Sequence, residues 1–181
     1  PWRKAIFSSS DSILLVEGSI DKEYFDLLSA DAHGTNKLDF GGAIIEYGGY
    51  GALRSQSMLN AVKQINPKMF LTFDLDAKDK VTKTIEGIGL EKNKTYLPLG
   101  LDQPGMRDIE GLLPSSVREK VKSKNPTLID ALGGTSDERK EAKDKLKKLY
   151  LKEFKASAMP GEEYYGHFYK AVKIINRAFK K

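Results

Sequence analysis

Four short apolar runs, separated by segments with helical periodicity, constrain the fold of this chain more than any other feature. The runs occupy residues 13–16, 43–47, 69–74 and 94–99. Runs of this length between turn residues predict buried strands, whereas residues 19–30, 52–65 and 80–88 have the spacing of helices. Strands that alternate with helices form parallel sheets. We therefore expect an α/β fold with a parallel four-stranded sheet flanked by helices.

The pattern changes after Pro104, where no further strand is predicted. Helical segments are expected at residues 109–123, 136–157 and 161–179. A chain of 181 residues is long enough for one α/β core and a small appendage. The sequence thus predicts an α/β core over residues 1–104 and a helical extension over residues 105–181.

Positive charge is concentrated near the C-terminus. The formal net charge is +5, and residues 136–181 hold 13 Lys and Arg against 7 Asp and Glu, whereas residues 1–135 hold 17 against 18. This asymmetry is typical of a protein that attracts a polyanion such as DNA. A solvated helical surface rich in lysine explains the charge equally well.

Composition limits the chemistry that the chain can perform. Cysteine is absent, which excludes disulfides, thiolate zinc sites and cysteine nucleophiles. Only His33 and His167 are present, so a metal site would have to use oxygen ligands. No apolar run approaches the length of a membrane span, and we expect no membrane partner.

Carboxylates follow two of the expected strands. Glu17 comes directly after residues 13–16, and Asp74 ends residues 69–74, with Asp76 two residues later. The carboxyl ends of parallel strands meet at one edge of a sheet, where ligands gather. Crowded carboxylates repel one another unless a cation or a proton lies between them, so a hard divalent cation is expected here. Simpler explanations stay open, because an Asp-x-Asp segment is common in turns and an acid such as Asp21 stabilises a helix N-terminus.

These motifs resemble a known family. Val16-Glu17-Gly18 with Asp21, followed by Phe73-Asp74-Leu75-Asp76, is similar to the Toprim domain of topoisomerases, primases and OLD-family (overcoming lysogenization defect) nucleases. The OLD nucleases are the most similar, because the segment 107–114 and a lysine-containing helical extension also resemble theirs. The motif support covers about residues 6–115. Related nucleases often carry Glu-Asn-Tyr where this chain has Glu110-Gly111-Leu112, which weakens the assignment of Glu110.

The resemblance implies a Toprim-like, Rossmann-type sheet and a catalytic metal site. Glu17 and Asp74 would be catalytic. The implied metal ligands are Glu17, Asp21, Asp74, Asp76, Asp108 and Glu110. They would hold two Mg²⁺ or Mn²⁺ ions about 3.5–4 Å apart, which activate water and stabilise the leaving oxygen during phosphodiester cleavage. A lysine of the helical extension would stabilise the transition state. Lys155 is the preferred candidate and Lys152 the second, although a solvated lysine on a basic helix explains either residue as well.

The resemblance further implies a metal-dependent DNA endonuclease or nickase in the cytoplasm of a prokaryotic cell. In OLD proteins an ABC-type ATPase domain precedes this region, and it would allow the full-length chain to form a homo-oligomer. Two alternatives remain. One is a non-catalytic module that binds metal and nucleic acid, and the other is a Toprim domain of the topoisomerase or primase type. A phosphotransfer receiver fits poorly, because its paired acids and strand-end lysine are not evident.

Overall fold

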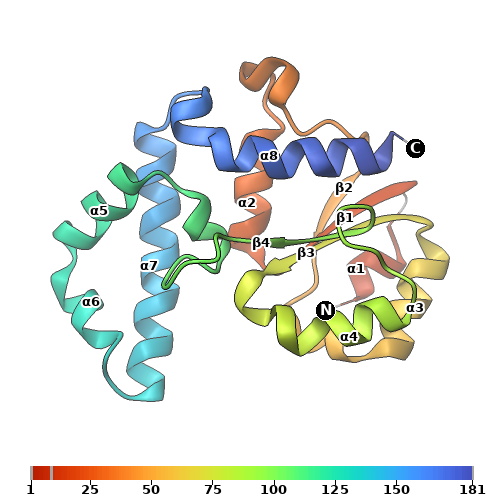
Figure 1. Cartoon of the computed structure of the whole chain (residues 1–181), viewed down its shortest axis with the longest axis horizontal. Helices are drawn as coiled ribbons and strands as arrows, with labels where there is room; N and C mark the ends of the chain where they lie inside the picture. Colours follow the sequence, from red (N-terminus) through yellow and green to blue (C-terminus); the bar gives the residue numbers. More distant parts are fainter. Residues whose placement is uncertain (1, 9, 181) are drawn as a thin grey trace.

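A four-stranded parallel sheet forms the centre of the molecule (Figure 1). The computed structural model describes residues 2–8 and 10–180. The strands are β1 (Ser12–Val16), β2 (Ala43–Glu46), β3 (Lys68–Asp74) and β4 (Tyr96–Leu99), in the order β2-β1-β3-β4. In this register Leu14 lies opposite Ile44 and Phe70, and Asp74 lies opposite Leu99. The predicted α/β fold with its parallel four-stranded sheet is confirmed.

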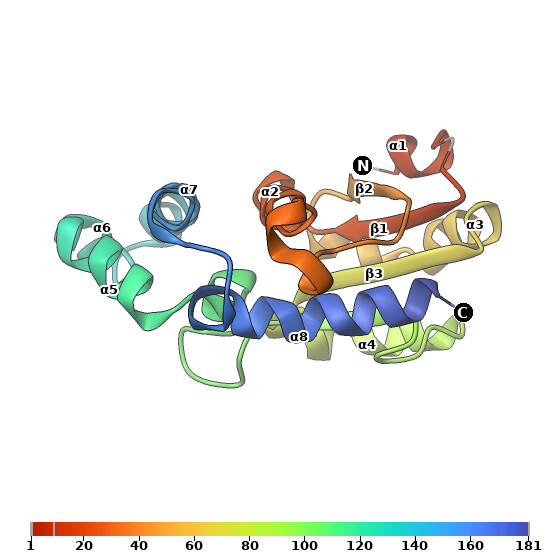
Figure 2. The same cartoon turned by 90° about the horizontal axis from the view of Figure 1, so that it is seen from above.

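Helices cover both faces of this sheet (Figure 2). One face packs against α1 (Arg3–Ile6), α3 (Gln56–Ile65) and α4 (Lys78–Gly87), and the other against α2 (Ser19–Leu28) and α8 (Glu162–Phe179). Successive strand residues point to opposite faces, so Ile13 and Leu15 join the first core and Leu14 and Val16 join the second. Both cores are apolar, which is why β1 is buried along its whole length.

The last helix, α8, returns to the sheet from the end of the chain. Its Phe179 ring stacks on Phe40 at 4.6 Å between centroids, and the Tyr169 hydroxyl lies 2.8 Å from Nδ1 of His33. Phe168, Val172 and Ile175 of α8 are buried in the core that contains Leu14 and Phe70. The predicted extension over residues 105–181 therefore ends in a helix that covers the sheet.

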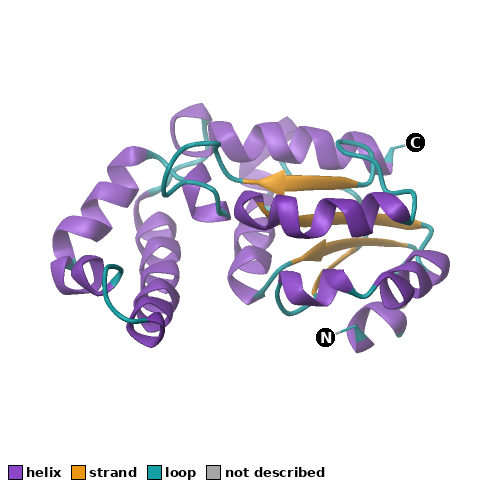
Figure 3. Ribbon diagram, turned by 60° about the horizontal axis from the view of Figure 1, so that its bottom comes forward, coloured by secondary structure: helices purple, strands orange, loops and turns teal. Residues whose placement is uncertain are grey.

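Three other helices form an arm to one side of the sheet (Figure 3). The helical arm, residues 115–157, consists of α5 (Ser115–Lys124), α6 (Pro126–Ala131) and α7 (Ser136–Ser157). The predicted bounds of α7 are confirmed. Thr135 and Glu138 form a capping box at its N-terminus, in which the Thr135 N–H donates to Glu138 Oε2 at 2.8 Å. α7 packs against α5, α6 and α2, and so connects the arm with the sheet.

The remaining elements are short and were partly missed by the sequence patterns. Short 3-10 segments occupy Asp31–Asn36, which is kinked at Gly34, and Tyr50–Arg54, Leu75–Ala77 and Ile109–Leu112. The helices predicted at 52–65 and 109–123 each begin as one of these segments before α3 and α5, and α1 and α6 were not predicted at all. Within residues 2–8 and 10–180, no helix combines the length and the apolar character that crossing a bilayer requires.

Candidate functional site

Two of the predicted acidic residues meet where the strand order reverses. β1 pairs with β2 on one side and with β3 on the other, so the connections after β1 and β3 diverge from this point. Glu17 follows β1, and Asp74 is the last residue of β3. Open parallel sheets bind ligands at such a switch point, outside the carboxyl ends of the strands.

A glycine turn after β2 holds Glu17 in place. The backbone N–H groups of Gly48 and Gly49 both donate to the Glu17 carbonyl at 3.0 Å, and the Tyr50 N–H donates to its Oε1 at 3.3 Å. The turn requires φ values of 84° at Gly48 and 95° at Gly49, which favour glycine. The second oxygen, Oε2 of Glu17, is buried without a hydrogen-bond partner. A buried carboxylate oxygen of this kind is suited to contact a cation.

Asp21 caps the helix that follows Glu17. Its Oδ2 accepts the Gly18 N–H at 2.7 Å, at the N-terminus of α2. The side chain is buried, and burial raises the pKa of Asp21 to about 6 although Lys147 opposes the shift. Asp21 therefore has a structural role in capping, and it also contributes charge to the cluster around Asp74.

The segment after β4 brings the third pair of acids to the same place. The Ile109 N–H donates to Asp74 Oδ1 at 3.0 Å, and the Asp76 N–H donates to the Arg107 carbonyl at 2.9 Å. A side chain at Gly111 could not be accommodated, because its Cβ would lie 2.0 Å from the Met106 carbonyl oxygen. This tight turn places Asp108 and Glu110 beside Asp74.

A lysine that the motifs did not single out lies among these acids. Nζ of Lys147, on α7, is 3.5 Å from Asp74 Oδ2 and 3.6 Å from Glu110 Oε2. Both carboxylate oxygens of Glu110 are buried and accept no hydrogen bond. Burial favours the neutral amine, but the carboxylates of Glu110 and Asp74 outweigh it and raise the pKa of Lys147. Lys147 therefore remains a cation and balances part of the acidic charge.

Lys155, the lysine expected from the sequence, lies elsewhere. It forms an exposed ion pair with Glu23 of α2 and does not line the cleft described below. Lys152 is also exposed and outside it. The helical extension does bring a lysine to the acids, as expected, but this lysine is Lys147, about two turns earlier in α7.

The acids and the arm enclose a cleft of about 710 Å³. Its acidic side contains five of the six predicted metal ligands, namely Glu17, Asp74, Asp76, Asp108 and Glu110. Its other side is basic and comes from α5 and α7, with Arg118, Lys122, Arg139, Lys140, Lys143 and Lys147. Tyr50 and Tyr150 also line it, and Asp144 is an acid on the arm's side.

The buried acids bind protons more tightly than free carboxyl groups do. Burial raises the pKa of Asp74 to about 9, because desolvation outweighs the attraction of Lys147. Burial likewise raises the pKa of Glu110 to about 8 and shifts that of Asp108 in the same direction. Each carboxylate therefore carries an electrostatic cost that a bound cation would remove.

The donor set fits a hard cation. The predicted ligands that line the cleft are all carboxylates, and those of Glu17 and Glu110 include buried oxygen atoms without hydrogen bonds. As the side chains are oriented here, no three His, Asp or Glu residues of segments 2–8 and 10–180 are grouped to hold one metal ion. Binding would therefore require these side chains to reorient and Lys147 to give up part of its contact with Asp74 and Glu110.

No family model, curated protein or solved structure matches this chain. The resemblance to Toprim and OLD proteins therefore rests on the short sequence motifs.

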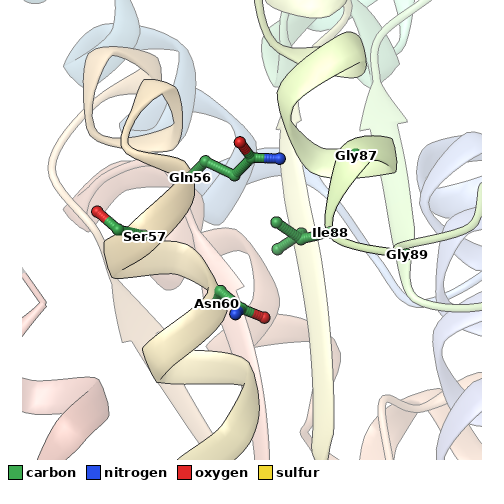
Figure 4. A pocket seen from close by; sticks show the side chains of 6 residues that line it. All are labelled: Gln56, Ser57, Asn60, Gly87, Ile88 and Gly89. Atoms are coloured by element: carbon green, nitrogen blue, oxygen red, sulfur yellow. The ribbon is translucent and has the colours of Figure 1, made fainter.

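A second hollow lies between α3 and the end of α4 (Figure 4). It is lined by Gln56, Ser57, Asn60, Gly87, Ile88 and Gly89. None of these side chains is titratable, and none of the predicted site residues lines it. It is an open hollow next to the loop after α4.

The raised pKa values predict that the metal-free chain loses stability as the pH rises. Between the pKa of an unfolded carboxyl group, near 4, and the folded values of about 8 to 9, the native state binds more protons than the unfolded state. The free energy of unfolding should therefore fall by roughly 1–4 kcal/mol between pH 6 and pH 8, given a limit of about 1.4 kcal/mol per group and pH unit. Urea unfolding in EDTA measures this change.

The double variant Asp74→Asn, Glu110→Gln is the control for this prediction. It keeps His33 and His167, whose pKa values burial lowers and whose effect on stability has the opposite sign. Its stability should decline less with pH than that of the wild type. A wild-type stability that stays level or rises from pH 6 to pH 8 would contradict the assigned burial cost. Added Mg²⁺ at pH 8 should stabilise the wild type more than the double variant.

Proposed function

We propose that this chain is a nuclease domain that uses Mg²⁺ or Mn²⁺ to cleave the phosphodiester bonds of DNA. The observation that supports this most is the cleft at the switch point of the sheet, where buried carboxylate oxygens without hydrogen bonds face a basic wall. A polyanion would be attracted to the wall, and a cation to the acids. A phosphate in the cleft would then lie between the bound cation on one side and the basic wall on the other.

The proposed roles follow from the position of each side chain. Glu17, Asp74 and Glu110 are the ligands that would hold the metal, since all three line the cleft, and backbone N–H groups orient the carboxylates of Glu17 and Asp74. Asp76 and Asp108 lie on the same side and would complete the site or accept water molecules. When bound, Mg²⁺ or Mn²⁺ would supply a Lewis acid for the phosphoryl oxygen and would make the attacking water more acidic.

Lys147 has a separate role in the proposal. Its ammonium group stays charged, and it lies within 4 Å of two of the proposed ligands. A cation at this position would stabilise the extra negative charge that develops on phosphate as the bond breaks. The chain otherwise positions the substrate and excludes water from the buried acids.

A non-catalytic module is the second candidate, and one observation favours it. Lys147 balances Asp74 and Glu110 without any metal, as it would in a permanent structural ion pair. In this case the cleft would bind a nucleic acid or another acidic partner without reacting with it. Structural ion pairs perturb pKa values as catalytic sites do, so these values alone do not separate the two candidates.

Incubation of the chain with supercoiled plasmid separates them. We expect nicked and then linear DNA in Mg²⁺ or Mn²⁺, and unchanged plasmid in EDTA or in buffer without added metal. Plasmid that is bound but stays intact across both metals at pH 7–9 would favour the module. Closed circles that lose supercoils without a nick would instead indicate strand passage of the topoisomerase type.

A further inference from the structure

One face of α7 forms a basic stripe along the cleft. The stripe consists of Arg139, Lys140, Lys143 and Lys147, which all line the cleft. Lys143 lies three residues after Lys140 and four after Arg139, and Lys147 lies four residues after Lys143. Residues at this spacing lie on the same side of a helix. The stripe ends at Lys147, beside Asp74. It therefore leads from the far end of the arm to the acidic site.

A second helix adds to the same wall. Arg118 and Lys122 of α5 are four residues apart and also line the cleft. α5 packs against α7, so the two helices present their basic side chains to one space. We call Arg118, Lys122, Arg139, Lys140 and Lys143 the basic track. Asp144 is the one acid that the two helices contribute to this wall, so the track has a positive balance.

The lysines of the track differ from three other lysines on the same helices. Lys120 and Lys124 both pair with Glu153, and Lys145 pairs with Glu141. By contrast, Lys122, Lys140 and Lys143 are exposed and form no ion pair within the described parts of the chain. Acids thus neutralise Lys120, Lys124 and Lys145 outside the cleft, while the three lysines of the track are left for a ligand.

The two arginines of the track have partners on the backbone. Arg118 Nε donates to the Leu113 carbonyl at 3.2 Å, and Arg139 donates to the carbonyls of Leu132 and Gly134 at 3.2 and 3.3 Å. These bonds hold the turns of the arm and leave the arginines' positive charge without a carboxylate. The arginines therefore fix the track, and the free lysines are its contact points.

We propose that the basic track binds the sugar–phosphate backbone of DNA next to the phosphate that is cleaved. This deepens the proposed function and rests on it for the position of the scissile phosphate. Residues 139–147 rise by about 12 Å along α7. One DNA strand advances about 3.4 Å per nucleotide, so the stripe spans about three to four nucleotides. Lysine binds phosphate as a point charge, without reading bases, and the contact is therefore independent of sequence.

Two matched triple variants test the track. The first is Lys122→Ala, Lys140→Ala, Lys143→Ala, and the second is Lys120→Ala, Lys145→Ala, Lys148→Ala. Each removes one lysine from α5 and two from α7, so the loss of charge is equal, but the second triple lies outside the cleft. All six are exposed helical positions, where alanine preserves the helix. Circular dichroism verifies this.

Binding is measured without cleavage, by fluorescence anisotropy of a labelled 24-base-pair duplex in EDTA at several KCl concentrations. The logarithm of the association constant should fall with the logarithm of salt, with about 0.9 added to the slope per phosphate contact. The first variant should reduce this slope by about 2–3 and weaken binding at low salt about ten-fold or more, equally for unrelated sequences. The second variant should change the slope by less than about 1.

The track proposal would be overturned if the two variants had equal slopes, or if the first variant kept the slope of the wild type. The proposed function is tested separately by plasmid cleavage in Mg²⁺, where the first variant should raise KM and keep kcat within about three-fold. If the wild type binds DNA through the track but never cleaves it, the nuclease proposal fails and the track stands. If the wild type cleaves and both variants bind alike, the track fails alone.

Discussion

Replacing Asp74 by Asn is expected to reduce the rate of plasmid nicking in Mg²⁺ by at least about 100-fold. Asn has nearly the same shape, and its side-chain oxygen can still accept the Ile109 N–H that now bonds Asp74 Oδ1. It lacks the negative charge that a hard cation requires. Loss of an outer-shell partner already costs roughly 10- to 100-fold, and a direct ligand should cost more.

The same substitution should leave the fold intact. Burial raises the pKa of Asp74 and so disfavours its charged form without metal, and the neutral amide removes this cost. The melting temperature in EDTA should therefore stay level or rise, while the stabilisation by Mg²⁺ should diminish. Asp79→Asn is the matched control, since Asp79 is exposed in the first turn of α4 and does not line the cleft. If Asp74→Asn nicks plasmid as fast as Asp79→Asn, the proposed site is wrong.

The strand-end acids could be predicted because strand geometry fixes them. Apolar runs such as residues 13–16 predict strands, and an acid directly after a buried strand must lie at its carboxyl end. The run before Asp74 has the same character, and parallel pairing then brings both acids to one edge. The local pattern and the pairing of parallel strands are enough to place these acids, whatever the order of the strands.

The lysine could not be predicted in this way. Lys147 and Lys155 each follow a buried apolar residue of α7, Leu146 and Phe154, so helical periodicity treats them alike. They are eight residues apart, about 12 Å along the helix, and only the docking of the arm decides which one reaches the acids. A partial signal was present in the spacing of Arg139, Lys140, Lys143 and Lys147, which share one face of the helix.

The position of α8 illustrates a second limit. Its apolar face predicts burial, and the helix was found within one residue of the expected bounds. The amphipathic pattern does not specify which surface buries that face, however. In the structure Phe179 packs on Phe40, from the loop before β2, so the end of the chain completes the core of the sheet domain. Such long-range packing is decided by the whole chain.

Lys147→Met is expected to cleave plasmid about 100-fold more slowly than Lys155→Met. Met preserves much of the length and the apolar stem of lysine and removes its charge. Loss of a group that stabilises charge in a transition state typically costs about 10²–10³-fold in kcat, and we expect this for Lys147. Lys155 forms an exposed ion pair with Glu23, which contributes little, so its variant should stay within about two-fold of the wild type.

Metal binding distinguishes this role from a purely structural ion pair. Lys147 competes with a cation for Asp74 and Glu110, so Lys147→Met should bind Mg²⁺ several-fold more tightly by calorimetry although it cleaves more slowly. If Lys147 had only a structural role, its loss would disorder the site, and the variant would bind Mg²⁺ less tightly than the wild type. If Lys147→Met cleaves normally, the charge that assists the reaction must come from another residue of the cleft. The next residue to test would be Lys143, which precedes Lys147 in the α7 stripe.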